Sequence, residues 1–222
     1  MKHIYLLLAA KMISNIAGVG IILFVSAGTL HYPTGWIFIA LLVAAALIYV
    51  HLMLKTQPQL LEKRLIYREN NLCQQIVIFS SLLICIAMLC LTGLSFRYGW
   101  YSFPAYRYIV SGAIAIPAAL LLRRVMKENA FLTSEITVQE DQRVIQTGPY
   151  GLIRHPMYTA MWLLSLAGAI ALGSVWSLLG PLLFLPVLIL RVCNEEKLLM
   201  RQLPGYWEYT QKTKYRLIPF IW

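Results

Sequence analysis

Long uninterrupted apolar stretches constrain the fold of this chain more than any other feature of its sequence. A helix of about 20 apolar residues crosses the hydrocarbon core of a bilayer, and six stretches reach or approach that length: residues 4–27, 35–54, 74–96, 106–125, 157–173 and 175–191. Backbone groups in hydrocarbon must be hydrogen-bonded within the segment, which makes each stretch a helix. The sequence therefore predicts an all-α integral membrane protein with about six transmembrane helices.

The composition supports this prediction, because 59% of the 222 residues are hydrophobic and only 13% are charged, which is unlike soluble domains. The first stretch contains no small-residue cleavage site of a secretory signal, so we expect it to be retained. Gly18-Val19-Gly20 lies inside this stretch rather than after a strand, which excludes a soluble dinucleotide-binding domain.

Lys and Arg are distributed unevenly around the predicted spans, and this distribution predicts the orientation. If the N-terminus is cytoplasmic, the outer loops contain only Arg97 and Arg107 as basic residues, and Lys11 lies in the first span. All other basic residues then lie on the cytoplasmic side, so we expect both termini in the cytoplasm. Contact of these flanks with anionic lipid headgroups accounts for the net charge of +10 without any nucleic acid.

The last two apolar stretches are joined only by Leu172-Gly173-Ser174, which predicts a tight helical hairpin over residues 157–191. A hairpin brings its two ends to the same side, and here each end adjoins a polar segment, Glu128–Arg154 or Arg191–Trp222. Within the second segment we expect a helix from Glu195 to Leu203. The chain thus divides into a transmembrane scaffold of about four spans, residues 1–126, and a region of unusual polar residues, 127–222.

The cysteines offer no sign of a metal centre. Cys73, Cys85, Cys90 and Cys193 lack the spacing of metal ligands and fall in or beside predicted spans. We interpret them as free thiols and expect no metal.

The segment GPYGLIRHPMY, Gly148 to Tyr158, interrupts the apolar pattern just before the hairpin. Pro156 suits the first position of a helix, where its missing N–H costs nothing. The N–H groups of the next three residues, 157–159, would then be free at the positive end of the helix dipole and form an anion site. Arg154 and His155 could add charge there; alternatively, they only cap the span and touch headgroups.

A second motif, RVCNEEKLL, follows the last span. Arg191 and Glu195 are four residues apart and share a helix face, with Glu196 beside them. The pair could be an ordinary surface ion pair, but the chain has only nine acidic residues, and two adjacent ones at a membrane boundary need solvation or partners. The aromatic and basic tail, LPGYWEYTQKTKYRLIPFIW, is most simply an interfacial anchor.

These motifs in their order carry a resemblance to a known family. From about Phe131 to the C-terminus the chain has Q-x-x-Q-R-V-I-x-T-G-P-Y-x-x-x-R-H-P-M-Y, then R-x-x-x-E-E-x-x-L, L-P-G-Y-x-x-Y and R-L-I-P-x-I-W. This region resembles the isoprenylcysteine carboxyl methyltransferase family and its relatives, the phospholipid N-methyltransferases. Many family members have a histidine where Gln142 stands.

The resemblance implies an integral-membrane methyltransferase that uses S-adenosylmethionine, with a cofactor pocket at the cytosolic face and a lipophilic or prenylated acceptor arriving from the lipid. It assigns cofactor contacts to Gln139, Gln142, Arg143, Val144, Ile145, Tyr150, His155, Pro156, Met157, Tyr158, Glu195 and Glu196, and acceptor binding to Arg191. Arg191 and Glu195 are the expected catalytic residues.

The chemistry of methyl transfer agrees with this assignment. Displacement at a sulfonium has a neutral leaving group, so the enzyme must mainly position its substrates and complement their charges. Arg191 could orient a carboxylate acceptor, whereas Glu195 could offset the sulfonium or take the proton of an amine acceptor.

Several alternatives remain open at this point. The acceptor could be the carboxylate of an isoprenylcysteine-like substrate, a phospholipid amine or a small thiol. A sterol-type membrane reductase that binds NADPH is similar in its His-Pro-x-Tyr region, although the paired acids of RVCNEEKLL disfavour a 2′-phosphate. A non-catalytic membrane protein is the third possibility.

Overall fold

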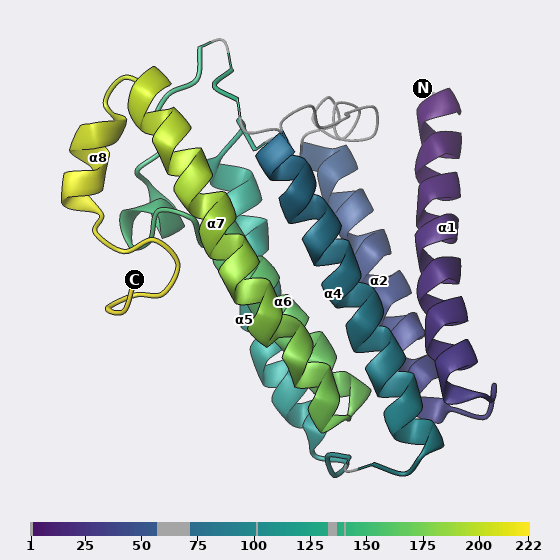
Figure 1. Ribbon diagram of the computed structural model, residues 1–222. Helices are drawn as coiled ribbons and strands as arrows, with labels where there is room; N and C mark the ends of the chain where they lie inside the picture. The colour runs from purple at the N-terminus through teal and green to yellow at the C-terminus, as the bar shows by residue number, and fades with distance from the viewer. Residues whose placement is uncertain (1, 57–71, 101, 133–136, 140) are drawn as a thin grey trace.

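The computed structural model describes residues 2–56, 72–100, 102–132, 137–139 and 141–222. Six long helices form the bundle shown in Figure 1: α1 (Lys2–Ala27), α2 (Pro33–Thr56), α4 (Leu72–Arg97), α5 (Arg107–Glu128), α6 (Pro156–Leu172) and α7 (Leu179–Gln202). A short helix α8 (Tyr206–Lys212) and two 3₁₀ turns, η1 (Gly148–Gly151) and η2 (Val175–Leu178), complete the described elements. The described residues form only two isolated β-bridges, so the all-α prediction is confirmed.

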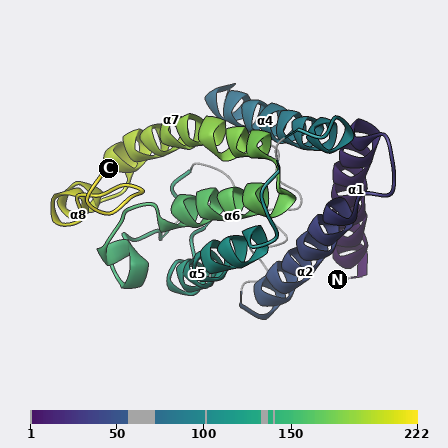
Figure 2. The ribbon, with the colours of Figure 1, turned by 90° about the horizontal axis from the view of Figure 1, so that it is seen from below.

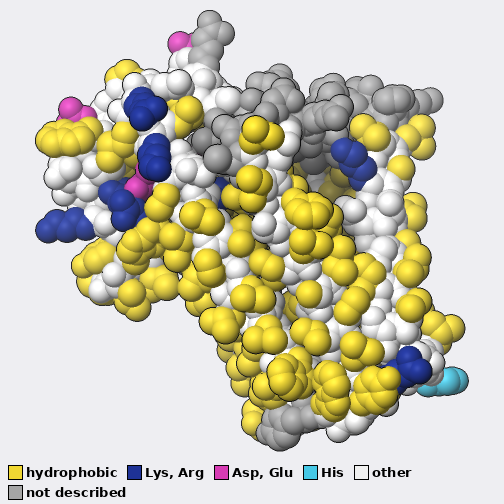
Figure 3. Space-filling model, viewed as in Figure 1, with side chains coloured by type: hydrophobic (Ala, Val, Ile, Leu, Met, Phe, Trp, Pro, Cys, Tyr) yellow, Lys and Arg dark blue, Asp and Glu magenta, His cyan; other side chains and the backbone are white. Residues whose placement is uncertain are grey.

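Among the described residues, five helical segments are long and apolar enough to cross a membrane, namely Leu6–Ala27, Pro33–Lys55, Gln74–Arg97, Arg107–Glu128 and Val175–Gln202. The prediction of an integral, multi-pass membrane protein is confirmed. α6 has 17 residues and is about 26 Å long, which is shorter than the hydrocarbon core of about 30 Å. Figure 3 shows hydrophobic side chains covering the helices, while Lys and Arg gather over the C-terminal half of α7 and the tail beside it.

α7 is longer than the predicted span, because the helix expected at Glu195–Leu203 continues the span without a break. No Pro or Gly separates Arg191 from Glu195, so nothing interrupts the helix before Leu203-Pro204-Gly205. Its 24 residues are about 36 Å long, so α7 is longer than its hairpin partner α6. The described part of the predicted polar segment 128–154 is largely loop, and residues 133–136 and 140 lie outside the described residues.

Seen along the bundle, α6 is flanked by α5 and α7, and α4, α1 and α2 continue around it (Figure 2). α1 and α4 approach closely at Gly93, where an added Cβ would lie 2.6 Å from Cβ of Ser26 and 2.7 Å from the carbonyl oxygen of Leu23. Only glycine permits this approach, as is common where membrane helices pack through small residues.

The turn of the α6–α7 hairpin is fixed to the α4–α5 connection. Gly173 has a φ of 85°, and its carbonyl oxygen accepts a hydrogen bond of 2.7 Å from the N–H of Phe103. Arg107 donates hydrogen bonds to the hydroxyls of Thr34 and Tyr108, both at 3.0 Å. We call this end of the bundle the far end, and the opposite end, where α5 ends and α6 begins, the pocket end.

At the pocket end, the last ten residues, 213–222, fold back against the start of α6; we call them the C-terminal strap. The backbone N–H groups of Arg154 and His155 donate to the carbonyl oxygens of Tyr215 and Arg216, each at 2.9 Å. The hydroxyl of Thr159 donates to the carbonyl oxygen of Leu217 at 2.7 Å. The tail that the sequence suggested as an interfacial anchor is therefore packed on the GPYGLIRHPMY segment.

Candidate active site

A pocket of about 840 Å³, open to solvent, lies at the pocket end between the start of α6, the C-terminal half of α7 and α8. Among the described residues, those that line the pocket come from the C-terminal half of the chain: Asn129, Phe131, Leu132, Thr137, Gln142, Arg143, Val144, Ile145, Tyr150, Arg154, His155, Pro156, Met157, Tyr158, Arg191, Glu195, Leu198, Leu199, Leu203, Tyr206 and Tyr209. Most residues expected at the site from the sequence thus surround one pocket.

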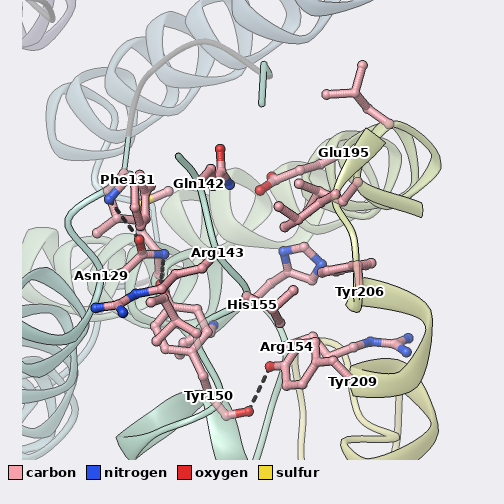
Figure 4. A pocket seen from close by; sticks show the side chains of 18 of the residues that line it. Asn129, Phe131, Gln142, Arg143, Tyr150, Arg154, His155, Glu195, Tyr206 and Tyr209 are labelled. Atoms are coloured by element: carbon pink, nitrogen blue, oxygen red, sulfur yellow. Dashed lines mark hydrogen bonds between the residues drawn. The ribbon is translucent and has the colours of Figure 1, made fainter. Parts of the chain in front are cut away.

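Arg191 and Glu195 are joined through Tyr158, the last residue of the GPYGLIRHPMY segment. The hydroxyl of Tyr158 donates a hydrogen bond of 2.6 Å to Oε2 of Glu195 and accepts one of 3.0 Å from Nε of Arg191. Tyr158 is 5% exposed, and its ring stacks on that of His155 with 5.9 Å between the ring centroids. The guanidinium of Arg191 and the carboxylate of Glu195 are therefore held on one pocket wall. Figure 4 shows the Glu195 side chain pointing toward Gln142.

Glu196 lies behind this wall and does not line the pocket. Its Oε1 is 2.8 Å from Nε of Arg154 and 3.3 Å from Nε2 of His155, and its Oε2 accepts a hydrogen bond of 2.7 Å from Nε of Arg216. The Arg154 N–H is not aligned with the carboxylate, so this contact is an ion pair without a hydrogen bond. Glu196 is 5% exposed, and its assignment as a cofactor contact stays a prediction.

The first turn of α6 begins at Pro156, as the sequence predicts. The prediction of three free N–H groups is wrong in two cases, because Tyr158 and Thr159 donate to the carbonyl oxygen of His155 at 3.1 and 3.3 Å. His155, with φ −125° and ψ 58°, turns its carbonyl toward this first turn and so uses donors that an anion would need. The helix end alone is therefore a weaker anion site than expected.

The loop before η1 contributes Gln142, Arg143, Val144 and Ile145 to the pocket, as the resemblance implies. Gln139 does not line it but shapes the loop. Its backbone N–H donates to Oε1 of Gln142, and its side chain donates to the carbonyl oxygen of Phe131, both at 2.8 Å.

Sequence reasoning missed several residues of the site. Leu198 and Leu199 follow Glu195 by three and four residues, so helical spacing could have placed them on the same face. Asn129 had no such signal; its side-chain amide donates to the Tyr150 hydroxyl at 2.9 Å. Burial raises the pKa of Tyr150 to about 12, against the opposing effect of this hydrogen bond, so the phenol stays protonated at neutral pH.

Two tyrosines of α8 were also missed, and they differ in their hydrogen bonding. The Tyr209 hydroxyl donates to the carbonyl oxygen of Tyr150 at 2.7 Å. The Tyr206 hydroxyl is buried and has no hydrogen-bond partner among the described residues. Burial raises the pKa of Tyr206, and the negative charges of Glu196 and Glu195 raise it further. The hydroxyl therefore stays protonated and can donate a hydrogen bond.

Comparison with known proteins bears on these observations. Residues 107–204 match the family model of the phospholipid methyltransferases. Among solved structures, the chain is similar to the eukaryotic intramembrane Ras methyltransferase, an isoprenylcysteine carboxyl methyltransferase, with a TM-score of 0.56 and 18% identity. The match covers 92% of this chain and 75% of that one, and at this identity it shows the fold alone. No curated protein matches the chain. Residues 107–204 are therefore similar to the phospholipid methyltransferases, and the chain shares the fold of the solved isoprenylcysteine carboxyl methyltransferase.

Proposed function

We propose that the protein transfers a methyl group from S-adenosylmethionine to a lipophilic acceptor at the membrane, most favourably to the carboxylate of an isoprenylcysteine-like molecule. The observation that carries this proposal is the arrangement of Arg191, Tyr158 and Glu195 on one wall of a pocket whose lining lies largely within the family match. We also propose that residues 1–126 are the scaffold and 127–222 the catalytic region, because the described residues that line the pocket lie between Asn129 and Tyr209.

The residues of the pocket fit the methyl donor. Tyr206 offers a buried hydroxyl with no partner among the described residues, which suits a polar group of the donor. Phe131, Tyr150 and Tyr209 provide aromatic surface for a purine ring. Glu195 supplies a negative charge opposite the donor's positive sulfonium or ammonium group. When bound, the donor would supply an electrophilic methyl group.

The contribution of the protein to catalysis would be positioning. Tyr158 fixes the guanidinium of Arg191 and the carboxylate of Glu195 relative to each other through two hydrogen bonds. Arg191 is then ready to bind an acceptor carboxylate, while the Glu195 side chain lies beside the donor. Holding two reactants in a fixed geometry can itself supply much of the rate enhancement.

A second cavity supports the lipophilic character of the acceptor. It lies between α2, α4, α5, α6 and α7, contains about 1810 Å³ of open space, and has almost entirely apolar walls. On α6 the pocket lining ends at Tyr158 and the cavity lining begins at Leu164, a separation of about 9 Å along the helix. A hydrocarbon chain attached to a head group at Arg191 could therefore lie in this cavity.

A phospholipid amine is the second candidate acceptor. It is favoured by the family model and by Glu195, which could take the proton of an ammonium group before transfer. A small thiol is less favoured, since it would use neither Arg191 nor the apolar cavity.

The first test is calorimetry of the purified protein with S-adenosylmethionine and S-adenosylhomocysteine, with NADPH as the control. We expect both sulfur ligands to bind and NADPH not to bind; binding of NADPH alone would make the protein a reductase. A labelled methyl donor and acceptors with either a carboxylate or an amine on chains of increasing length would then identify the acceptor. Labelling of introduced cysteines from each side of the membrane would test the proposed cytoplasmic position of both termini.

A further inference from the structure

Glu196 connects three segments that are distant in the sequence. It belongs to α7, Arg154 and His155 belong to the segment before α6, and Arg216 belongs to the C-terminal strap. The Glu196 and Arg154 side chains are each 7% exposed, whereas that of Arg216 is 36% exposed. A buried carboxylate needs such cationic partners to stay ionised, so the network constrains where all three segments can lie.

The C-terminal strap contacts the pocket only indirectly. None of its residues, 213–222, lines the pocket. Its backbone nevertheless accepts hydrogen bonds from the N–H groups of Arg154 and His155, which do line it. The position of the Arg154–His155 wall therefore depends on a strap that does not itself face the pocket.

We propose that Glu196 and Arg216 are positioning residues for methyl-donor binding: their ion pair holds the C-terminal strap against Arg154 and His155, and so sets one wall of the donor pocket. This inference rests on the proposed function. It gives Glu196 a role other than direct contact with the donor. The C-terminal strap would then support the pocket wall and would not only anchor the chain at the membrane.

Substitution of Arg216 separates this role from a purely structural one. Arg216→Gln leaves Glu196 with the Arg154 guanidinium and the His155 ring, so the buried carboxylate keeps polar partners and the fold should persist. Arg216→Lys keeps the charge. Lys214→Gln is the matched control, because it removes one positive charge from an exposed position of the same strap.

The measurement is the affinity for S-adenosylhomocysteine by calorimetry, together with the rate at which endoproteinase Lys-C cleaves after Lys212. For Arg216→Gln we expect affinity to fall about tenfold, within the usual range of coupling between contacting residues, and cleavage to accelerate. Arg216→Lys should retain most of the affinity, and Lys214→Gln should change it less than twofold, with similar melting temperatures for all variants. The double variant Glu196→Gln/Arg216→Gln should bind no more weakly than Glu196→Gln alone.

Equal affinity of Arg216→Gln and Lys214→Gln would overturn the inference, as would weaker binding without faster cleavage after Lys212. If the unmodified protein binds neither S-adenosylmethionine nor S-adenosylhomocysteine, the proposed function fails instead. The cleavage rates would still decide whether Arg216 holds the strap.

Discussion

Replacement of Tyr206 by phenylalanine should change stability and donor affinity in opposite directions. The Tyr206 hydroxyl is buried at the pocket wall and has no hydrogen-bond partner among the described residues, and such a group costs about 1–3 kcal/mol in the unliganded protein. The Tyr206→Phe substitution would remove this cost without removing a hydrogen bond seen in the structure. We therefore expect the unliganded variant to melt a few degrees higher, at about 2–4 °C per kcal/mol for a chain of this size.

Donor affinity should fall, because the variant loses the hydroxyl that we assign to the ligand. One hydrogen bond contributes about 0.5–1.5 kcal/mol, which corresponds to a loss of about twofold to tenfold in affinity. Calorimetry with S-adenosylhomocysteine and thermal unfolding in the same detergent measure the two quantities.

Tyr209→Phe provides the matched control, since Tyr209 also belongs to α8 and lines the pocket. Its hydroxyl donates to the carbonyl oxygen of Tyr150, so its removal should lower the melting temperature. The reasoning is refuted if Tyr206→Phe melts below the unmodified protein, or if it binds S-adenosylhomocysteine with unchanged affinity.

The remaining predictions concern the pocket wall formed by Arg191, Tyr158 and Glu195, and the packing of α1 against α4. Glu195→Gln should abolish methyl transfer while the protein stays folded in detergent, as measured with labelled donor; near-normal turnover would remove Glu195 from the site. Arg191→Ala should chiefly raise the apparent KM for the acceptor, and an effect limited to donor affinity would contradict its role. Tyr158→Phe loses two hydrogen bonds to charged groups, so kcat/KM should fall at least about tenfold, given about 1.5–3 kcal/mol for each such bond. Gly93→Leu should destabilise the bundle by about 1–3 kcal/mol through overpacking, whereas Gly18→Leu, where an added Cβ has no neighbour within 4 Å, should leave the melting temperature nearly unchanged.

The helices and the general place of the site could be predicted from the sequence, because both depend on local patterns. Apolar length predicted the spans, and Pro156 and Leu203-Pro204-Gly205 marked a helix start and a helix end. The spacing of Arg191 and Glu195 also placed them on one face. Each of these sequence signals lies within a few residues of the structural feature that it predicts.

Contacts between distant segments could not be predicted in this way. Nothing in the sequence indicates that Tyr158 bonds to Glu195, 37 positions away, or that Arg216 binds Glu196. The expectation of three free N–H groups at the start of α6 was wrong for a related reason: the carbonyl oxygen of His155, whose own N–H is bonded to the strap, accepts two of them. Such features follow from tertiary packing, which a single sequence does not encode in local patterns.

The unequal arms of the α6–α7 hairpin have a kinetic consequence. α7 continues past Arg191 for about 16 Å toward the pocket end, whereas α6 begins only near the level of Arg191, so one side of the site is open toward water and the apolar cavity begins on the other. A water-soluble donor and a bilayer-borne acceptor would then enter by different routes, and neither would block the other. We expect binding in random order, with intersecting double-reciprocal plots, and release of the methylated product sideways into the lipid while the spent donor leaves to the aqueous phase.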